Sequence, residues 1–174
     1  MKRILLSVML ITITLLGCAG NKNQQAQNLE ETEEQSIEQE AIQAPDFTLD
    51  DLNGKPLQLS SLRGKYVILD FWGSWCGWCI KGFPQMKEYY DKYHGKFEIL
   101  GIDCNDSEAK WKAAVKQYEL PWLHVYCPRG SQIFSDYAIQ GFPTKVIIDP
   151  KGNIVETIIG EDPAFYTLLD QLFK

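Results

Sequence analysis

Two cysteines separated by two residues, Cys76 and Cys79, carry the clearest chemistry in this chain. They follow a mostly apolar run, residues 66–72, that is typical of a buried parallel strand, and we expect a helix to begin at them. The N-terminus of a helix offers unpaired N–H groups and a partial positive charge, which favour a thiolate over a thiol. Because a thiolate attacks disulfides and a nearby second thiol can resolve the mixed disulfide, the pair predicts disulfide exchange.

The first residues predict export and a lipid anchor. Lys2 and Arg3 precede an apolar stretch, residues 4–16, that is shorter than the ~20 residues a membrane span needs. It ends at Gly17-Cys18, which resembles the signal of bacterial lipoproteins, where the cysteine is lipidated and becomes the first mature residue. The alternative is an ordinary signal peptide with a chance cysteine. We expect residues 1–17 to be a lipoprotein signal peptide and the protein to be anchored in the bacterial cell envelope, outside the cytoplasm.

Residues 18–44 differ in composition from the rest and predict a flexible acidic tether after the lipidated Cys18. Positions 19–44 hold six Gln and six Glu against one Lys, with no aromatic residue. Such a segment cannot bury enough apolar surface to offset the entropy of ordering. The formal net charge of the chain is −6, and no basic patch is present, which argues against nucleic acid as a partner.

Residues 45–174 predict one α/β domain with a single core. Apolar runs alternate with helical patterns, and a hairpin signal, Asn53-Gly54, lies near the start. We expect strands at 45–49, 56–59, 66–72, 97–103, 122–126, 144–149 and 154–159, and helices at 76–94, 107–118, 132–137 and 163–173. This order predicts a mixed central sheet with helices on both faces and an added N-terminal β-hairpin.

Three separate segments resemble the thioredoxin superfamily. Residues 70–79, with Pro84 five positions later, resemble the thioredoxin active-site segment, and residues 141–144 resemble its cis-proline loop. The features shared with the membrane-anchored TlpA/ResA-type branch are residues 45–47, Leu59, Leu62 and Gly64-Lys65. The resemblance covers about residues 45–174 and implies a thioredoxin-like fold without a bound cofactor.

The resemblance also implies roles at the active site. Cys76 is expected to be the nucleophile and Cys79 the more buried, resolving thiol. Asp70 occupies the position of the superfamily's buried carboxylate, where burial raises its pKa and lets it accept the proton of Cys79. The alternative for Asp70 is a surface residue at a strand end. The lysine that the superfamily carries on the strand after the first helix is not evident in residues 97–103.

Aromatic residues around the cysteines predict a surface for protein substrates. Trp75 precedes the nucleophile and is expected to shield it, whereas Trp72 is expected in the core. Trp78 stands where thioredoxins usually carry proline, and this departure leaves the redox potential open. By resemblance, a cis bond before Pro143 would present the Phe142 backbone to an incoming chain as a strand-like edge.

Two further cysteines, Cys104 and Cys127, could form a second disulfide. If Cys18 is lipidated and Cys76 pairs with Cys79, they are each other's only remaining partner. Both end strands that this topology places side by side, about 4.7–4.9 Å apart, within reach of a disulfide. The alternative is two unrelated small buried residues.

Three function classes remain at this point. The first is a lipid-anchored, monomeric thiol–disulfide oxidoreductase with protein substrates and an unidentified electron donor; the resemblance favours reduction of protein disulfides, as in cytochrome c maturation. The second is a copper or zinc module using Cys76 and Cys79, although related copper chaperones space their cysteines wider and add a histidine, and a Cys₄ zinc site needs a second such pair. The third, a peroxiredoxin-type peroxidase, carries Thr three residues before its cysteine, where this chain has Gly73.

Overall fold

The computed structural model describes residues 41–174. The predicted signal peptide, Cys18 and most of the predicted tether lie outside the described residues, so these assignments stay predictions. Within the described part, no helix has the length and apolar character needed to cross a membrane.

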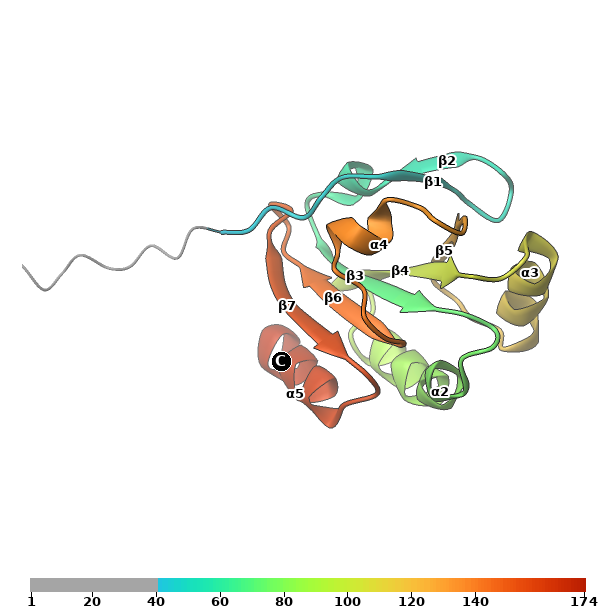
Figure 1. Ribbon diagram of the computed structural model, residues 1–174. Coiled ribbons are helices and arrows are strands. Elements are labelled where there is room, and N and C mark those ends of the chain that lie inside the picture. The colour runs from blue at the N-terminus through green and yellow to red at the C-terminus, as the bar shows by residue number, and fades with distance from the viewer. Residues whose placement is uncertain (1–40) are drawn as a thin grey trace, which may run out of the picture. The chain divides into compact units, whose positions relative to one another are not determined.

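A mixed five-stranded sheet forms the centre of the domain, in the order β5-β4-β3-β6-β7 (Figure 1). Strands β3, β4 and β5 are parallel, whereas β6 runs antiparallel to β3 and to β7. Their bounds are Tyr66–Trp72 (β3), Phe97–Cys104 (β4), Leu123–Cys127 (β5), Thr144–Ile148 (β6) and Ile154–Ile159 (β7). The predicted fold class is confirmed, with each strand within one or two residues of its expected place.

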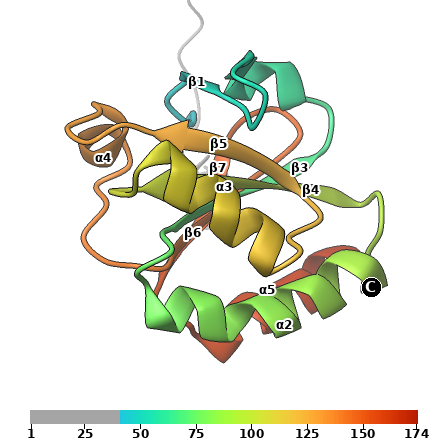
Figure 2. The ribbon, with the colours of Figure 1, turned by 90° about the vertical axis from the view of Figure 1, so that its right-hand side faces the viewer.

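Helices cover both faces of this sheet. On one face α2 and α5 lie side by side, with the Tyr89 and Tyr166 rings 4.8 Å apart (Figure 2). The helices are α2 (Gly77–Lys92), α3 (Glu108–Gln117), α4 (Ile133–Asp136) and α5 (Pro163–Phe173). Ser107 caps α3 as expected, since its side chain accepts the N–H of Lys110. Gly95 follows the end of α2 with a φ of +76°, a left-handed backbone conformation that glycine adopts more easily than other residues.

The N-terminal hairpin is also present. Strands β1 (Thr48–Asp50) and β2 (Pro56–Gln58) pair antiparallel, and a 3₁₀ turn, η1 (Leu59–Leu62), follows. The Asp51 side chain accepts the N–H groups of Asn53 and Lys55 and closes the loop. The hairpin and η1 lie on the same side of the sheet as α4 (Figure 1).

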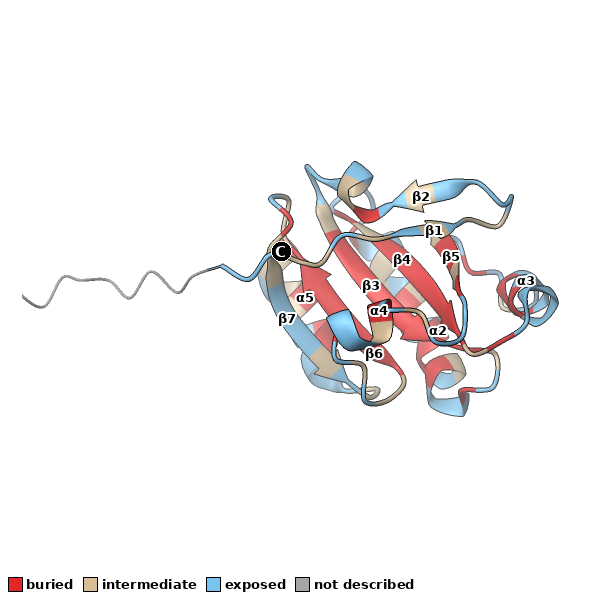
Figure 3. Ribbon diagram, turned by 45° about the horizontal axis from the view of Figure 1, so that its top comes forward, coloured by how far each residue is buried: buried red, intermediate tan, exposed pale blue. Residues whose placement is uncertain are grey.

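Strand β3 is buried on both faces, and its alternating side chains divide the core in two (Figure 3). Val67, Leu69 and Phe71 pack toward the α4 side, and Ile68 and Trp72 toward α2 and α5. Asp70 lies between Ile68 and Trp72 in this alternation and therefore faces the active-site helix.

Candidate active site

The two cysteines of the motif form a disulfide at the start of helix α2. Cys76 is the N-cap residue, and Cys79 lies in the first turn with its N–H 3.1 Å from the Cys76 sulfur. Cys76 is 5% exposed and Cys79 2%. The structure therefore places both sulfurs at the start of α2. A thiolate at Cys76 would accept the Cys79 N–H and lie at the positive end of the helix.

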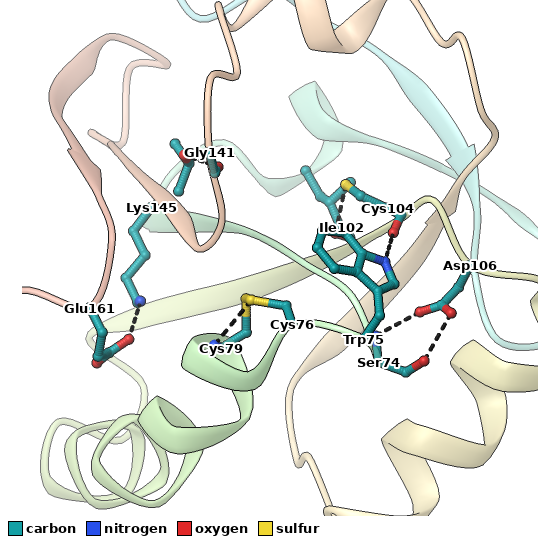
Figure 4. Close-up of a disulfide and its surroundings, with 11 residues drawn as sticks. Ser74, Trp75, Cys76, Cys79, Ile102, Cys104, Asp106, Gly141, Lys145 and Glu161 are labelled. Atoms are coloured by element: carbon teal, nitrogen blue, oxygen red, sulfur yellow. Dashed lines mark hydrogen bonds and ion pairs between the residues drawn. A yellow bond between two sulfur atoms is a disulfide. The ribbon is translucent and has the colours of Figure 1, made fainter.

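The loop between β3 and α2 is fixed to the end of β4 (Figure 4). The Ser74 N–H and hydroxyl donate to the Asp106 carboxylate at 2.6 and 2.8 Å, and the Trp75 indole donates to the Cys104 carbonyl at 2.9 Å. Gly73 permits this close approach, because a Cβ there would lie 2.5 Å from Trp75 Nε1. The role of Asp106 in holding this loop was not predicted from the sequence, where its place just after β4 was the one indication.

Asp70 is buried on the face of the sheet whose residues Ile68 and Trp72 pack with Cys76 and Cys79. Burial raises the pKa of its carboxyl to about 6; Lys145 opposes this shift and Glu161 adds to it. Among residues 41–174, no hydrogen-bond partner reaches its Oδ1. A carboxyl in this state can exchange a proton near neutral pH.

An ion pair between buried Lys145 and half-buried Glu161, beside Asp70, was not predicted from the sequence. Lys145 Nζ lies 2.9 Å from a carboxylate oxygen of Glu161, and the lysine side chain is 1% exposed. Figure 4 shows this pair on one side of the disulfide and the Trp75 loop on the other. The sequence feature that could have indicated this pair is a charged residue, Lys145, within the otherwise mostly apolar β6.

The expected substrate-binding residues surround the disulfide in part. Trp75 and Trp78 are 51% and 63% exposed, and the Trp75 ring packs edge-on against Phe142 at 5.1 Å. The Phe142–Pro143 peptide bond is cis. Trp78 lies in the first turn of α2, under the ammonium of Lys81. Trp75 and Phe142 thus form one aromatic contact, and Trp78 is a separate exposed ring.

Cys104 and Cys127 are directly opposite each other in the register of β4 and β5. Both are buried and carry free thiols in this structure, and the Cys104 thiol lies 3.3 Å from the Ile102 carbonyl. They pack on the α4 side of the sheet, opposite to the face that holds Asp70. The predicted neighbourhood is present, and the disulfide between them stays a prediction.

The geometry has clear counterparts among known proteins. Residues 41–157 match the model of the AhpC/TSA family. The thiol-disulfide oxidoreductase ResA of Bacillus cereus (strain ZK / E33L) is 43% identical over 120 residues, 68% of this chain and 69% of that protein. ResA of Bacillus subtilis (strain 168) is 34% identical over 122 residues, 70% of this chain and 68% of that protein.

Solved structures agree with the sequence relatives. The thioredoxin domain of a Bacteroides vulgatus thiol-disulfide oxidoreductase superposes with a TM-score of 0.70 at 30% identity, covering 77% of this chain and 97% of that one. A thiol-disulfide oxidoreductase from Bacteroides fragilis NCTC 9343 gives a TM-score of 0.68 at 29% identity, covering 75% and 98%. The thioredoxin-like fold is therefore shared with proteins named for the same chemistry.

Proposed function

The chain belongs to the AhpC/TSA family and is a thioredoxin-like thiol–disulfide oxidoreductase, and on that premise we propose that it reduces disulfides of proteins outside the cytoplasm. The observation that carries the proposal is the arrangement at the start of α2. Cys76 caps the helix, Cys79 points its N–H at the Cys76 sulfur, and Asp70 is buried on the face of the sheet that this helix covers.

The reaction begins from the reduced enzyme. The Cys76 thiolate attacks one sulfur of a client disulfide, and the other client sulfur leaves as a thiolate that takes a proton from solvent. Cys79 then gives its proton to Asp70 and attacks the Cys76 sulfur. The second client sulfur leaves with the electron pair, and the Cys76–Cys79 disulfide of this structure is the product. Two electrons pass to the client, and a donor dithiol must return the enzyme to its reduced form.

The exposed aromatic residues support a protein client. Trp75 and Trp78 are exposed and Phe142 is half-buried, and they offer apolar area near sulfurs that are themselves almost buried. A client chain that lies on these rings would bring its disulfide to Cys76. The resemblance to the TlpA/ResA-type branch supports clients such as those of cytochrome c maturation, and the Gly17-Cys18 signal supports lipid anchoring in the cell envelope.

Trapping of clients tests which sulfur attacks. In Cys79→Ser the mixed disulfide on Cys76 cannot be resolved, so we expect covalent adducts on non-reducing gels that disappear with dithiothreitol. Cys76→Ser is the matched control and should give none, because Cys79 is one turn inside the helix. Adducts on Cys76→Ser but not on Cys79→Ser would reverse the assignment.

The reduction potential tests the direction of electron flow. Insulin reduction with dithiothreitol measures exchange activity, and metal analysis of the purified protein tests the alternative copper or zinc module. A potential near about −270 mV, as in thioredoxin, supports net reduction. A value near about −120 mV, as in the oxidant DsbA, contradicts it.

A further inference from the structure

A buried lysine and a half-buried glutamate form an ion pair beside the active-site helix. Lys145 Nζ lies 2.9 Å from Oε2 of Glu161 and 5.3 Å from the centre of the Phe165 ring. Removing two charges from water costs free energy that a mutual attraction does not always restore. Neither residue is part of the Cys76–Cys79 disulfide, so a charged pair at this place calls for a role of its own.

The lysine is aimed at the face of the sheet that holds Asp70. Lys145 on β6 is the direct antiparallel partner of Asp70 on β3, and both are buried. Direct partners in an antiparallel pair point to the same face with their Cβ atoms about 4.5–5.5 Å apart. The ammonium therefore acts on Asp70 across the strands while it is bonded to Glu161.

The glutamate occupies space that a glycine leaves open in α2. Gly82 lies three residues after Cys79, and a Cβ on it would come within 2.5 Å of the Glu161 Cδ. The Tyr166 hydroxyl on α5 donates to the other carboxylate oxygen at 2.7 Å. Glu161 is thus fixed between β6, α2 and α5, one helical turn from the resolving cysteine.

We propose that the Lys145–Glu161 pair governs proton uptake by Asp70, Lys145 favouring its carboxylate and Glu161 its carboxylic acid. This deepens the proposed function, in which Asp70 accepts the proton of Cys79. With Asp70 protonated the three groups sum to zero charge; with Asp70 ionised they sum to −1. Neither member of the pair touches the reacting sulfurs, so both are positioning residues.

Other titratable groups face the same layer. On α5, burial and the bond to Glu161 raise the pKa of Tyr166, so the phenol stays protonated. On β5, burial lowers the pKa of His124 to about 4, and on β4 burial and nearby Asp106 raise the pKa of Asp103 to about 8. In the oxidised protein Cys76 and Cys79 are disulfide-bonded and do not titrate.

Two charge-removing variants give opposite expectations. We would follow the carboxyl ¹³C signal of Asp70 in the oxidised, full-length protein, assigned by its loss in Asp70→Asn. Lys145→Met should move its titration midpoint up and Glu161→Gln should move it down, each by about one pH unit. Lys65→Met is the control: it breaks the Lys65–Glu98 pair at the opposite end of β3 and should leave the midpoint in place.

A glycine variant tests the same contact without removing a charge. Gly82→Ala forces the Glu161 carboxylate away, whereas alanine itself is the better helix former. It should shift the Asp70 midpoint in the same direction as Glu161→Gln. Gln85→Ala, on the exposed side of α2, should not. This variant keeps the test decisive even if Lys145→Met does not fold.

Shifts of the Asp70 midpoint in one common direction, or no shift in Glu161→Gln and Gly82→Ala, would overturn the proposal.

The proposed function is checked separately. The reduced protein is converted to a mixed disulfide between Cys76 and 2-nitro-5-thiobenzoate, and the rate at which Cys79 releases the aromatic thiolate is measured against pH. That profile should follow the NMR midpoints. An unchanged release rate in Asp70→Asn would contradict the catalytic role of Asp70, while opposite NMR shifts would still support the pair.

Discussion

Asp70 combines two requirements that conflict at the scale of a single residue. Its place on the face of the sheet that α2 covers suits proton exchange with Cys79, yet a buried carboxylate is costly for the fold. Burial raises its pKa from 3.8 to about 6, so between these values the folded protein holds a proton that the unfolded chain has released. Stability contributed by this group is present below about pH 4 and is lost as the pH rises through about 6.

Asp70→Asn should therefore stabilise the protein at neutral pH. The shift corresponds to a gain of up to about 3 kcal/mol in the free energy of unfolding above pH 7, fading toward pH 4. Denaturant unfolding of the oxidised protein across this pH range measures the difference. A gain that does not depend on pH would contradict a raised pKa at Asp70.

At the scale of elements, the loop from β3 to α2 depends on its attachment to the end of β4. One carboxylate, Asp106, accepts both Ser74 bonds and so connects the residues before Cys76 to a different strand. Hydrogen bonds to a charged group are stronger than neutral ones, and a buried donor left unpaired adds a further cost. The position of the first residues of α2 therefore depends on β4 as well as on β3.

Asp106→Ala should lower stability by about 1–3 kcal/mol and slow insulin reduction, because the loop that carries Cys76 loses its anchor. Thermal unfolding and the insulin assay measure the two effects. Asp50→Ala, an exposed carboxylate on β1, is the control and should change neither. Full activity in Asp106→Ala would show that the loop is held without this residue.

The elements could be predicted from the sequence because each rests on local patterns. The period of apolar residues, Ser107 as a cap and the turn at Asn53-Gly54 all act within a few positions. The contact of Lys145, Glu161 and Gly82 could not be predicted from the sequence. It joins a strand, a turn and a helix, and no local pattern specifies how these elements pack. The hydrogen bonds between Asp106 and Ser74 could not be predicted for the same reason.

At the scale of the whole molecule, the predicted anchor would decide where the domain can act. If residues 19–44 form the predicted tether, about 26 residues would give a mean reach of about 30 Å from the lipid. Clients would then have to present their disulfides close to the membrane surface.

Cys18→Ser should release the protein from the membrane. The apolar stretch before Cys18 is too short to span, so the lipid on this cysteine would be the attachment. Fractionation of cells followed by immunoblotting of the processed chain measures the distribution, with the unaltered protein as reference. Processed Cys18→Ser that still sediments with membranes would disprove the lipid anchor.

Three tryptophans close to Cys76 in the sequence also give the protein an optical property. Trp75 and Trp78 flank Cys76 in the chain, and Trp72 ends the strand that leads to it. Disulfides quench the fluorescence of nearby indoles far more strongly than free thiols do. Trp75 is oriented by its bond to the Cys104 carbonyl, so its emission reports on a fixed geometry. We therefore expect the indole emission of the unlabelled protein to rise when the Cys76–Cys79 disulfide is reduced.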